Sequence, residues 1–314
     1  MLLDAASVWS KAWPILFAIL FFGVIILIHE LGHFTVAKLS GIKVNEFAIG
    51  MGPKLLSFGK GETKYSLRLI PMGGYVQMEG EDEASEDERA FNQKPVWKRF
   101  LVVIAGAVMN IILGLVLVAI LLTQQNLIGT TQIAGFHENA SSQSSGLQEG
   151  DVITHINGTS VWSDRDISFL MARDRDGVID FTVKRDGQKT ELKNVKFDTR
   201  EVDGQTVITF DFIIIGENKT FWNVLKTSFL ETASMARLVW LSLFDLVTGR
   251  FGLSDLAGPV GTVSVIAEAT TSGGFLNALS LMAFITINIG VFNLLPIPGL
   301  DGGRLFFLII EGIR

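Results

Sequence analysis

Long apolar stretches dominate the hydrophobic pattern of this sequence. Ala12–Ile28 holds 17 residues without a charge, and Phe100–Leu122 holds 23 residues in which Asn110 is the only strongly polar side chain. A third stretch, most apolar over Phe275–Leu295, lies within a segment of 32 residues that carries no charge. Because a helix needs about 20 apolar residues to cross a bilayer, the pattern predicts three transmembrane helices.

The first apolar stretch predicts a retained helix. It is longer than the apolar region of a secretory signal peptide, and no small-residue cleavage site follows it. Basic residues in short loops remain on the cytoplasmic side of a membrane. We therefore expect a multi-pass protein of the cell membrane, with its N-terminus and the region after the second span outside the cytoplasm. The basic residues between the first two spans are Lys38, Lys43, Lys54, Lys60, Lys64, Arg68, Lys94, Lys98 and Arg99.

Between the spans the pattern changes to short alternating segments. Residues 44–78 alternate polar and apolar side chains around Gly and Pro, which predicts a β-hairpin. Residues 79–88 hold seven acidic side chains in ten and are interpreted as a solvated cytoplasmic linker. Residues 127–198 predict a small β-rich module. Residues 221–248 carry an apolar stripe at helical spacing, which could lie on a membrane surface or pack on the module.

The resulting fold class is a membrane α-helical protein with inserted β-rich elements. The first predicted region, 1–123, contains two transmembrane helices and the hairpin. The second, 124–200, is the polar module. The third, 201–314, contains a β-segment, the amphipathic helix and the third transmembrane helix.

Composition narrows the possible chemistry. Of the residues, 48% are hydrophobic and 18% are charged, and the mean hydropathy is +0.41, whereas soluble domains carry about 25% charged residues. The absence of cysteine excludes disulfides and cysteine-based metal sites. A net charge of −6 argues against a nucleic-acid partner. Any metal must therefore be bound by His, Asp or Glu, and the chain has only four His.

Two of those histidines form the motif His29-Glu30-Leu31-Gly32-His33. On a helix, residues four apart share one face, so both imidazoles can bind one zinc ion while Glu30 serves as general base. Ionisable side chains within a membrane span usually mark a functional site. The alternative is a helix with two structurally satisfied histidines.

A catalytic zinc needs a third protein ligand. His137 and His155 are poor candidates because they lie in the polar module beyond the second span. Asp301 is the first charge after the long neutral stretch, and Pro296 and Pro298 break the helix before it, so we expect a non-helical turn to present its carboxylate. Asp301 could otherwise be a simple cap or turn residue.

The sequence resembles the site-2 protease family of intramembrane zinc metalloproteases. Beyond the histidine motif, the resemblance extends over nearly the whole chain. The matching segments are Pro71-Met-Gly-Gly-Tyr75, Asp87-Glu-Arg-Ala-Phe-Asn-Gln-Lys-Pro-Val-Trp-Lys-Arg99, Ala257-Gly-Pro-Val-Gly261 and Asn293 to Gly302 with Pro296 and Pro298.

The resemblance implies a zinc metalloendopeptidase that cuts peptide bonds within transmembrane segments of single-span proteins. Anti-sigma factors and signal-peptide remnants are substrate types of the family, and the PDZ-like module leads us to expect substrates that another protease has already trimmed. His29, His33 and Asp301 would bind Zn²⁺, Glu30 would be the catalytic base, and residues 127–198 would form one extracytoplasmic PDZ domain, as in Gram-positive members.

The resemblance also implies residues that contact substrate. The hairpin, with Gly73 and Gly74, would offer a β-edge to the unwound substrate, and Asn293 and Asn288 would hold the substrate backbone. The alternative for the two asparagines is ordinary hydrogen bonding between helices.

One other reading remains open on the sequence alone, which is a non-catalytic membrane scaffold that presents the PDZ-like domain on three helices. A transporter could also use broken helices and buried carboxylates, but it would require inverted repeats, and the first and third spans show no internal similarity. A membrane-tethered protease of soluble peptides is disfavoured because the motif lies in the span itself. In the resembled family a further transmembrane helix usually follows the Asp-Gly segment, whereas this sequence stops at Arg314. We expect either a partial chain or one that functions with three spans.

Overall fold

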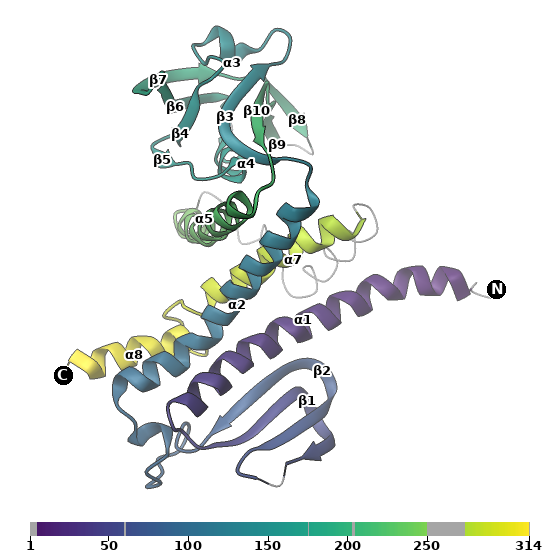
Figure 1. Cartoon of the computed structure of the whole chain (residues 1–314), viewed down its shortest axis with the longest axis vertical. Helices are drawn as coiled ribbons and strands as arrows, with labels where there is room; N and C mark the ends of the chain where they lie inside the picture. Colours follow the sequence, from purple (N-terminus) through teal and green to yellow (C-terminus); the bar gives the residue numbers. More distant parts are fainter. Residues whose placement is uncertain (1–4, 60, 175, 203–204, 250–273, 314) are drawn as a thin grey trace. The chain divides into compact units, whose positions relative to one another are not determined.

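The computed structural model describes residues 5–59, 61–174, 176–202, 205–249 and 274–313 (Figure 1). It divides into two compact units, of which one comprises Met1–Leu121 with Met235–Arg314 and the other comprises Leu122–Ser234. The segment Ala257 to Gly261, which contributes to the family resemblance, lies outside the described residues.

Helices and one β-hairpin build the first unit. Three helical segments, Ile15–Leu39, Val96–Gln124 and Gly274–Phe292, are long and apolar enough to cross a membrane. The three apolar stretches in the sequence therefore correspond to three candidate spans. The helices with residues in this unit are α1 (Ala5–Leu39), α2 (Val96–Gln124), the end of α5 (Phe221–Val247), α7 (Gly274–Phe292) and α8 (Asp301–Ile313), and a short 3₁₀ turn, η1 (Phe91–Gln93), precedes α2.

The first and third candidate spans pack against each other through apolar side chains. Ala18, Phe21 and Ile25 of α1 are buried together with Ile285 of α7. Leu20, on another side of α1, is 66% exposed. A helix that is apolar all round can be stable in lipid because its exposed side chains contact acyl chains instead of water.

The hairpin consists of β1 (Val44–Phe58) and β2 (Lys64–Met78), which pair antiparallel. Both strands bend back on themselves, so Ala48 faces Tyr75 on one side and Ser66 on the other. The segments therefore lie in the order 74–78, 44–49, 64–67 and 54–58. Among the described residues, no strand pairs with the outer side of segment 74–78, which is a free sheet edge.

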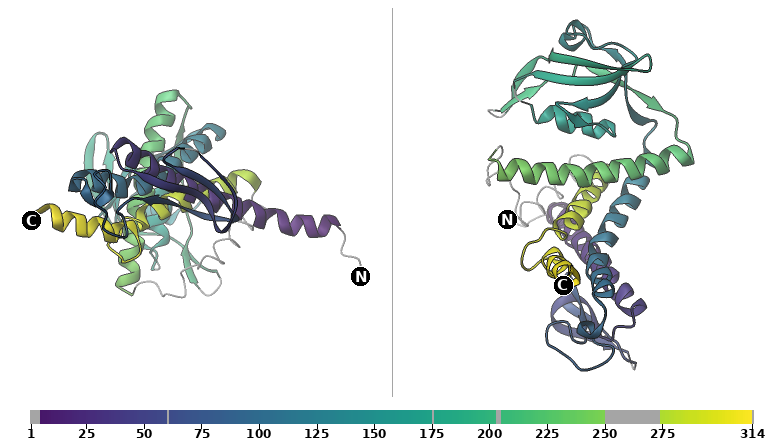
Figure 2. Two further views of the ribbon diagram at one scale, coloured as in Figure 1. Left: turned by 90° about the horizontal axis from the view of Figure 1, so that it is seen from below. Right: turned by 90° about the vertical axis from the view of Figure 1, so that its left-hand side faces the viewer.

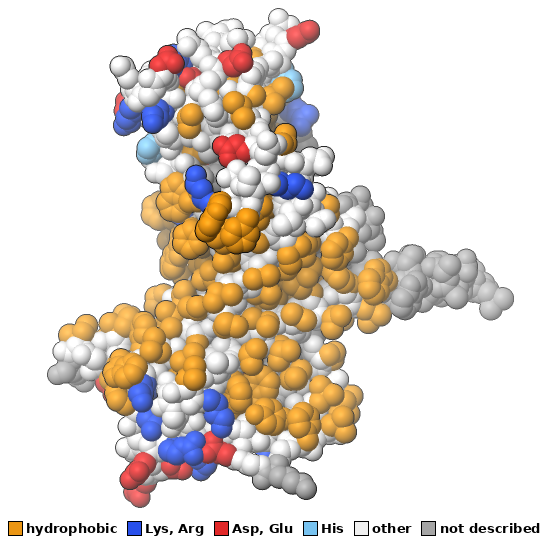
Figure 3. Space-filling view, viewed as in Figure 1, with side chains coloured by type: hydrophobic (Ala, Val, Ile, Leu, Met, Phe, Trp, Pro, Cys, Tyr) orange, Lys and Arg blue, Asp and Glu red, His pale blue; other side chains and the backbone are white. Residues whose placement is uncertain are grey.

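The two sides of the hairpin have different chemistry. Many of its apolar side chains are exposed, and they form a continuous apolar surface on the hairpin (Figure 3). Elsewhere Glu46 is buried and lies 3.1 Å from both Lys54 and Arg68, and Arg68 also donates to the Tyr75 hydroxyl. Burial opposes ionisation of Glu46, but hydrogen bonds from its polar neighbours lower its pKa to about 2. The exposed apolar residues are Ile49, Met51, Leu55, Leu56, Phe58, Leu67, Leu69 and Ile70.

The acidic segment 79–88 is attached to its surroundings. The Asn45 side chain donates to Glu79 at 2.9 Å, and Lys43 lies 3.1 Å from Asp87. The interpretation as a solvated linker is therefore only partly correct, because several of these carboxylates have fixed partners and others are exposed to solvent.

The second unit is rich in β-structure, as the sequence predicts. Strand β10 pairs with β3, so the sheet has the order β10-β3-β4-β6-β7 with β5 beside β4. Figure 2 shows the strands of this unit from two further sides. Helix α4 (Asp164–Ala172) packs against β3 and β4. The other elements are β3 (Ile128–Phe136), α3 (Ser141–Ser144), β4 (Val152–Ile156), β5 (Thr159–Ser160), β6 (Val178–Arg185), β7 (Gln188–Lys196), β8 (Thr199–Val202), β9 (Gln205–Ile208) and β10 (Phe212–Glu217).

Helix α5 begins in the second unit and uses its polar side there. Glu231 of α5 is 3% exposed and lies 2.7 Å from Arg165 of α4, and the Ser234 hydroxyl donates to Asp166. The apolar stripe, including Trp222 with 73% exposure, stays uncovered. The structure thus packs the polar side of α5 on the module, and the apolar stripe remains free to contact a membrane surface.

Candidate metal centre

Helix α1 brings the two motif histidines together. His29 and His33 are one helical turn apart, and their Nε2 atoms lie 3.1 Å from each other. Both side chains are largely buried, with exposures of 12% and 11%. Their position inside the candidate span Ile15–Leu39 places two polar rings in a largely apolar segment.

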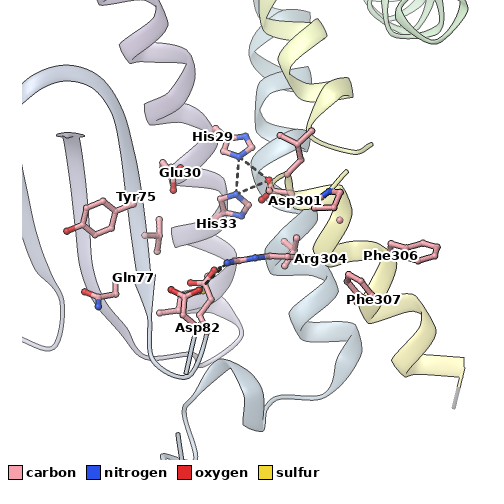
Figure 4. Close-up of a pocket in the computed structure, with 18 of the residues that line it drawn as sticks. His29, Glu30, His33, Tyr75, Gln77, Asp82, Asp301, Arg304, Phe306 and Phe307 are labelled. Atoms are coloured by element: carbon pink, nitrogen blue, oxygen red, sulfur yellow. Dashed lines mark hydrogen bonds and ion pairs between the residues drawn. The ribbon is translucent and has the colours of Figure 1, made fainter. Parts of the chain in front are cut away.

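Asp301 joins them from a distant part of the chain (Figure 4). Its Oδ2 lies 3.1 Å from His29 Nε2 and 3.3 Å from His33 Nε2. The helix does break after Phe292, as the prolines predict, but Asp301 is the first residue of α8. The expectation of a non-helical turn at Asp301 is therefore wrong, because a new helix begins at this residue. The start of that helix is fixed by a hydrogen bond of 2.6 Å from the Gly302 N–H to the Asn293 carbonyl.

These three side chains fit a zinc ion. One Nε2 from each imidazole and one carboxylate oxygen lie within 4.8 Å of one another. Three ligands of a tetrahedral zinc, each about 2.0–2.2 Å from the metal, stand roughly 3.3 Å apart, close to the three observed separations of 3.1, 3.1 and 3.3 Å. Converging lone pairs in an apolar environment also require a neutralising cation or proton.

Gly106 of α2 provides the space for this cluster. A Cβ atom at this position would lie 2.4 Å from His33 Nε2 and 2.7 Å from His29 Nε2, which is closer than such atoms can approach. Any larger residue would push the imidazoles out of position. The close contact of α2 with the histidines therefore depends on glycine.

The second nitrogen of each imidazole also has a partner on α2. His33 Nδ1 lies 2.8 Å from the Val102 carbonyl, and His29 Nδ1 lies 3.3 Å from the Asn110 side-chain amide. A histidine that binds zinc through Nε2 carries its proton on Nδ1 and donates it. For His29 the acceptor would be Asn110 Oδ1, which is buried and has no other partner among the described residues. A half-turn of the amide brings that oxygen to the imidazole.

Glu30 and the cluster face a cavity of about 920 Å³. One wall is the free edge of β2 at residues 75–78, and the opposite wall is formed by Pro296, Pro298 and the first turns of α8. Next to that edge, a Cβ on Gly74 would stand 3.4 Å from Glu30 Cγ. An extended chain on the β2 edge would therefore pass close to the Glu30 side chain.

The four residues expected to contact substrate are not among the residues that line this cavity. Gly73 forms the bend before the edge with a φ of 90°, and Gly74 pairs with Ile49. Asn288 lies on α7, and its Oδ1 is buried. Asn293 follows that helix and anchors Gly302 through its backbone. Their role in substrate binding stays a prediction.

The family model of peptidase family M50 matches residues 17–314. The chain belongs to peptidase family M50. It is 42% identical over 300 residues to a predicted zinc metalloprotease of Clostridium acetobutylicum, across 95% of this chain and 87% of the relative. It is 30% identical over 378 residues to the regulator of sigma-W protease RasP of Bacillus subtilis, across 94% and 89%. RasP of Bacillus licheniformis, named a zinc metalloprotease, is 32% identical over 386 residues, across 94% and 90%.

Membership in M50 agrees with the geometry. The protein is a zinc metalloprotease, and three apolar helices make it a multi-pass membrane protein. Among the described residues, the group formed by His29, His33 and Asp301 is the one that could hold a metal ion. The histidines of the second unit, His137 and His155, do not belong to it.

Asn110 was visible in the sequence only as a polar interruption of the second span, without a role. It is fully buried and contacts His29. Replacing it with leucine, which has a similar size and no acceptor, is expected to lower zinc affinity about 10- to 100-fold. Asn110→Asp keeps an acceptor oxygen and should retain more affinity than Asn110→Leu. Competition with a chelator measures the zinc affinity of both variants. Native affinity in Asn110→Leu would show that the contact between Asn110 and His29 does not contribute to zinc binding.

Proposed function

We propose that this M50 protein is an intramembrane zinc endopeptidase that hydrolyses peptide bonds within transmembrane segments of single-span membrane proteins. The observation that carries the proposal is the position of the His29–His33–Asp301 group. It combines two side chains from within a candidate span with one from the far end of the chain, and it opens into a cavity that Glu30 also lines.

In this proposal His29, His33 and Asp301 hold the metal and Glu30 moves the proton. A zinc ion held there would supply Lewis acidity, which lowers the pKa of water towards neutrality and polarises the carbonyl of the bond to be cut. Glu30 would accept a proton from the attacking water and deliver it to the nitrogen of the leaving amine. Nδ1–H groups that donate to the Val102 carbonyl and, after the half-turn of the amide, to Asn110 Oδ1 would keep the Nε2 lone pairs of both histidines free for the metal.

A peptide bond in a transmembrane helix is shielded by its own hydrogen bonds, so the helix must unwind before cleavage. The freed N–H and C=O groups need partners, since lipid supplies none. The free edge of β2 at residues 75–78 can pair with them as an added strand. Its place on one wall of the cavity supports this role, with Gly73 and Gly74 shaping the start of the edge and Asn288 and Asn293 holding the substrate backbone.

The proposed orientation places the hairpin and the acidic segment on the cytoplasmic side, as the basic residues predict. The N-terminus and the second unit are then extracytoplasmic, and residues 124–200 of that unit belong to a PDZ-like domain. The exposed apolar surfaces of the hairpin and of α5 suit contact with the bilayer.

The proposed substrates are remnants that another protease has already shortened, such as anti-sigma factors or signal-peptide remnants. A relative named as a regulator of sigma-W protease supports a regulatory substrate. The test compares membrane proteomes of cells that express the native protein or Glu30→Gln. Small single-span fragments should accumulate with the variant, and indistinguishable proteomes would contradict the proposed function.

The PDZ-like domain is proposed to exclude substrates that still carry a large extracytoplasmic part. A deletion should remove 127–217, because β10 completes the sheet by pairing with β3. The shortened protein is expected to cut intact substrates that the full chain rejects, which gel analysis of intact and trimmed forms measures. Unchanged selectivity for the trimmed form would exclude this role.

A further inference from the structure

Arg304 connects the two walls of the cavity. It lies one turn after Asp301 on α8, and its guanidinium donates to Glu81 and, at 3.2 Å, to Asp82 (Figure 4). The two carboxylates follow the end of β2 by three and four residues. All three side chains line the same cavity as Glu30 and the histidines. We call this ion-paired group the Arg304 clasp.

The wall that carries the β2 edge is anchored without the clasp. Val76 and Met78 are buried with Val102 and residues of α1 and β1. Beyond the strand, Glu79 accepts a hydrogen bond from Asn45, and its carbonyl accepts from the Phe91 N–H at 2.7 Å. The edge therefore keeps its position when the clasp is broken.

The opposite wall is also held independently. Leu305 and Leu308 of α8 pack with Val103 of α2. At the other end of the helix, Glu311 binds the Arg99 guanidinium through contacts of 2.5 and 3.0 Å. Helix α8 thus remains on α2 without Arg304. Within the described part of the chain, the clasp is the ion pair that joins α8 to the segment after β2.

The clasp crosses the path that an added strand would follow. Such a strand lies about 4.8 Å from the edge it pairs with, between residues 75–78 and α8. The clasp closes that gap just beyond Met78. Because the Arg304 side chain is 51% exposed and Asp82 is 83% exposed, and exposed ion pairs contribute little to stability, the contact between Arg304 and Asp82 can open at small cost. Glu81 is the more buried partner, with 13% exposure, and burial raises its pKa.

We propose that the Arg304 clasp is a gate at this end of the cavity, which must open before an extended substrate segment can lie along the β2 edge and reach the zinc site. This inference rests on the proposed function. It makes Arg304, Glu81 and Asp82 determinants of access, whereas Glu30 and the metal ligands carry out the reaction.

Reversible cross-linking tests the gate directly. The chain has no cysteine, so Glu81→Cys combined with Arg304→Cys supplies the only thiols, and a short bifunctional methanethiosulfonate joins them in the zinc-loaded full chain. Cross-linking should slow both cleavage of a single-span substrate and removal of zinc by EDTA by about tenfold or more, and a reductant should restore both rates. Unchanged rates after complete cross-linking would overturn the proposal.

A second pair of variants separates a gate from a positioning role. Arg304→Gln should lower the KM for the substrate and speed zinc removal by EDTA, with kcat within about twofold of native. Arg99→Gln is the matched control because it breaks the ion pair between Arg99 and Glu311 of α8, and neither residue lines the cavity. This variant should change neither the KM for the substrate nor the rate of zinc removal. A lower kcat with native KM in Arg304→Gln would overturn the gate. If the native protein cuts no transmembrane substrate, the proposed function fails, while the EDTA rates still decide whether the clasp controls access.

Discussion

Glu30→Gln is expected to retain stoichiometric zinc and to lose cleavage by about 10³-fold or more, within the range that general acid–base catalysis contributes. Glutamine has nearly the same size and can occupy the same place beside Gly74. It cannot accept a proton from water or return one to the leaving amine. The measurement is the cleavage rate of a purified single-span substrate, with the zinc content of the same sample.

The same variant reveals how substrate binds, because it should hold uncut substrate. Amide hydrogen exchange at residues 75–78 is expected to slow when substrate is added to Glu30→Gln, since a new strand would protect the free edge of β2. Undiminished proteolysis by Glu30→Gln would remove Glu30 from the mechanism. If cleavage is lost but amide exchange at residues 75–78 does not slow, the role of Glu30 as general base stands and strand addition to the β2 edge is excluded.

Asp301→Ala and His33→Ala are expected to lose both zinc and activity. Either change leaves two protein ligands, whereas a catalytic zinc site normally has three. The fold around Asp301 should persist because Gly302 N–H still bonds to the Asn293 carbonyl and Leu305 still packs on α2. The zinc content and the cleavage rate of the purified variants are measured, and thermal unfolding checks that the variants are folded.

His155→Ala provides the matched control for the loss of a ligand. It removes a histidine from the second unit, where His155 contacts Thr154 and belongs to no described metal group. Zinc content and cleavage should stay at the native level in this variant. Stoichiometric zinc in Asp301→Ala would show that the third ligand lies elsewhere.

The sequence predicts the elements that depend on local pattern. Apolar stretches of about 20 residues have few alternatives to a span, so the three helices were expected, and the spacing of His29 and His33 follows from helix geometry alone. Asp301 could be found because it ends a long neutral stretch. Its place at the start of α8 was missed, since the sequence shows where a helix breaks more clearly than where the next one starts.

Other features arise from contacts between segments far apart in the chain. The free edge at residues 75–78 exists because both strands of the hairpin fold back, and β10 joins the sheet through pairing with β3. Asn110 meets His29 across 81 positions, and Arg304 meets Glu81 across 223. No local periodicity records such pairings, so these residues gained a role only from the three-dimensional arrangement.

The most direct test of intramembrane zinc proteolysis is mass spectrometry of the products formed from a purified single-span substrate in lipid vesicles. We predict new termini within the apolar segment of the substrate, formed by the native protein and absent with Glu30→Gln. New termini found only in the soluble flanks, or termini inside the apolar segment that Glu30→Gln produces equally well, would contradict this function.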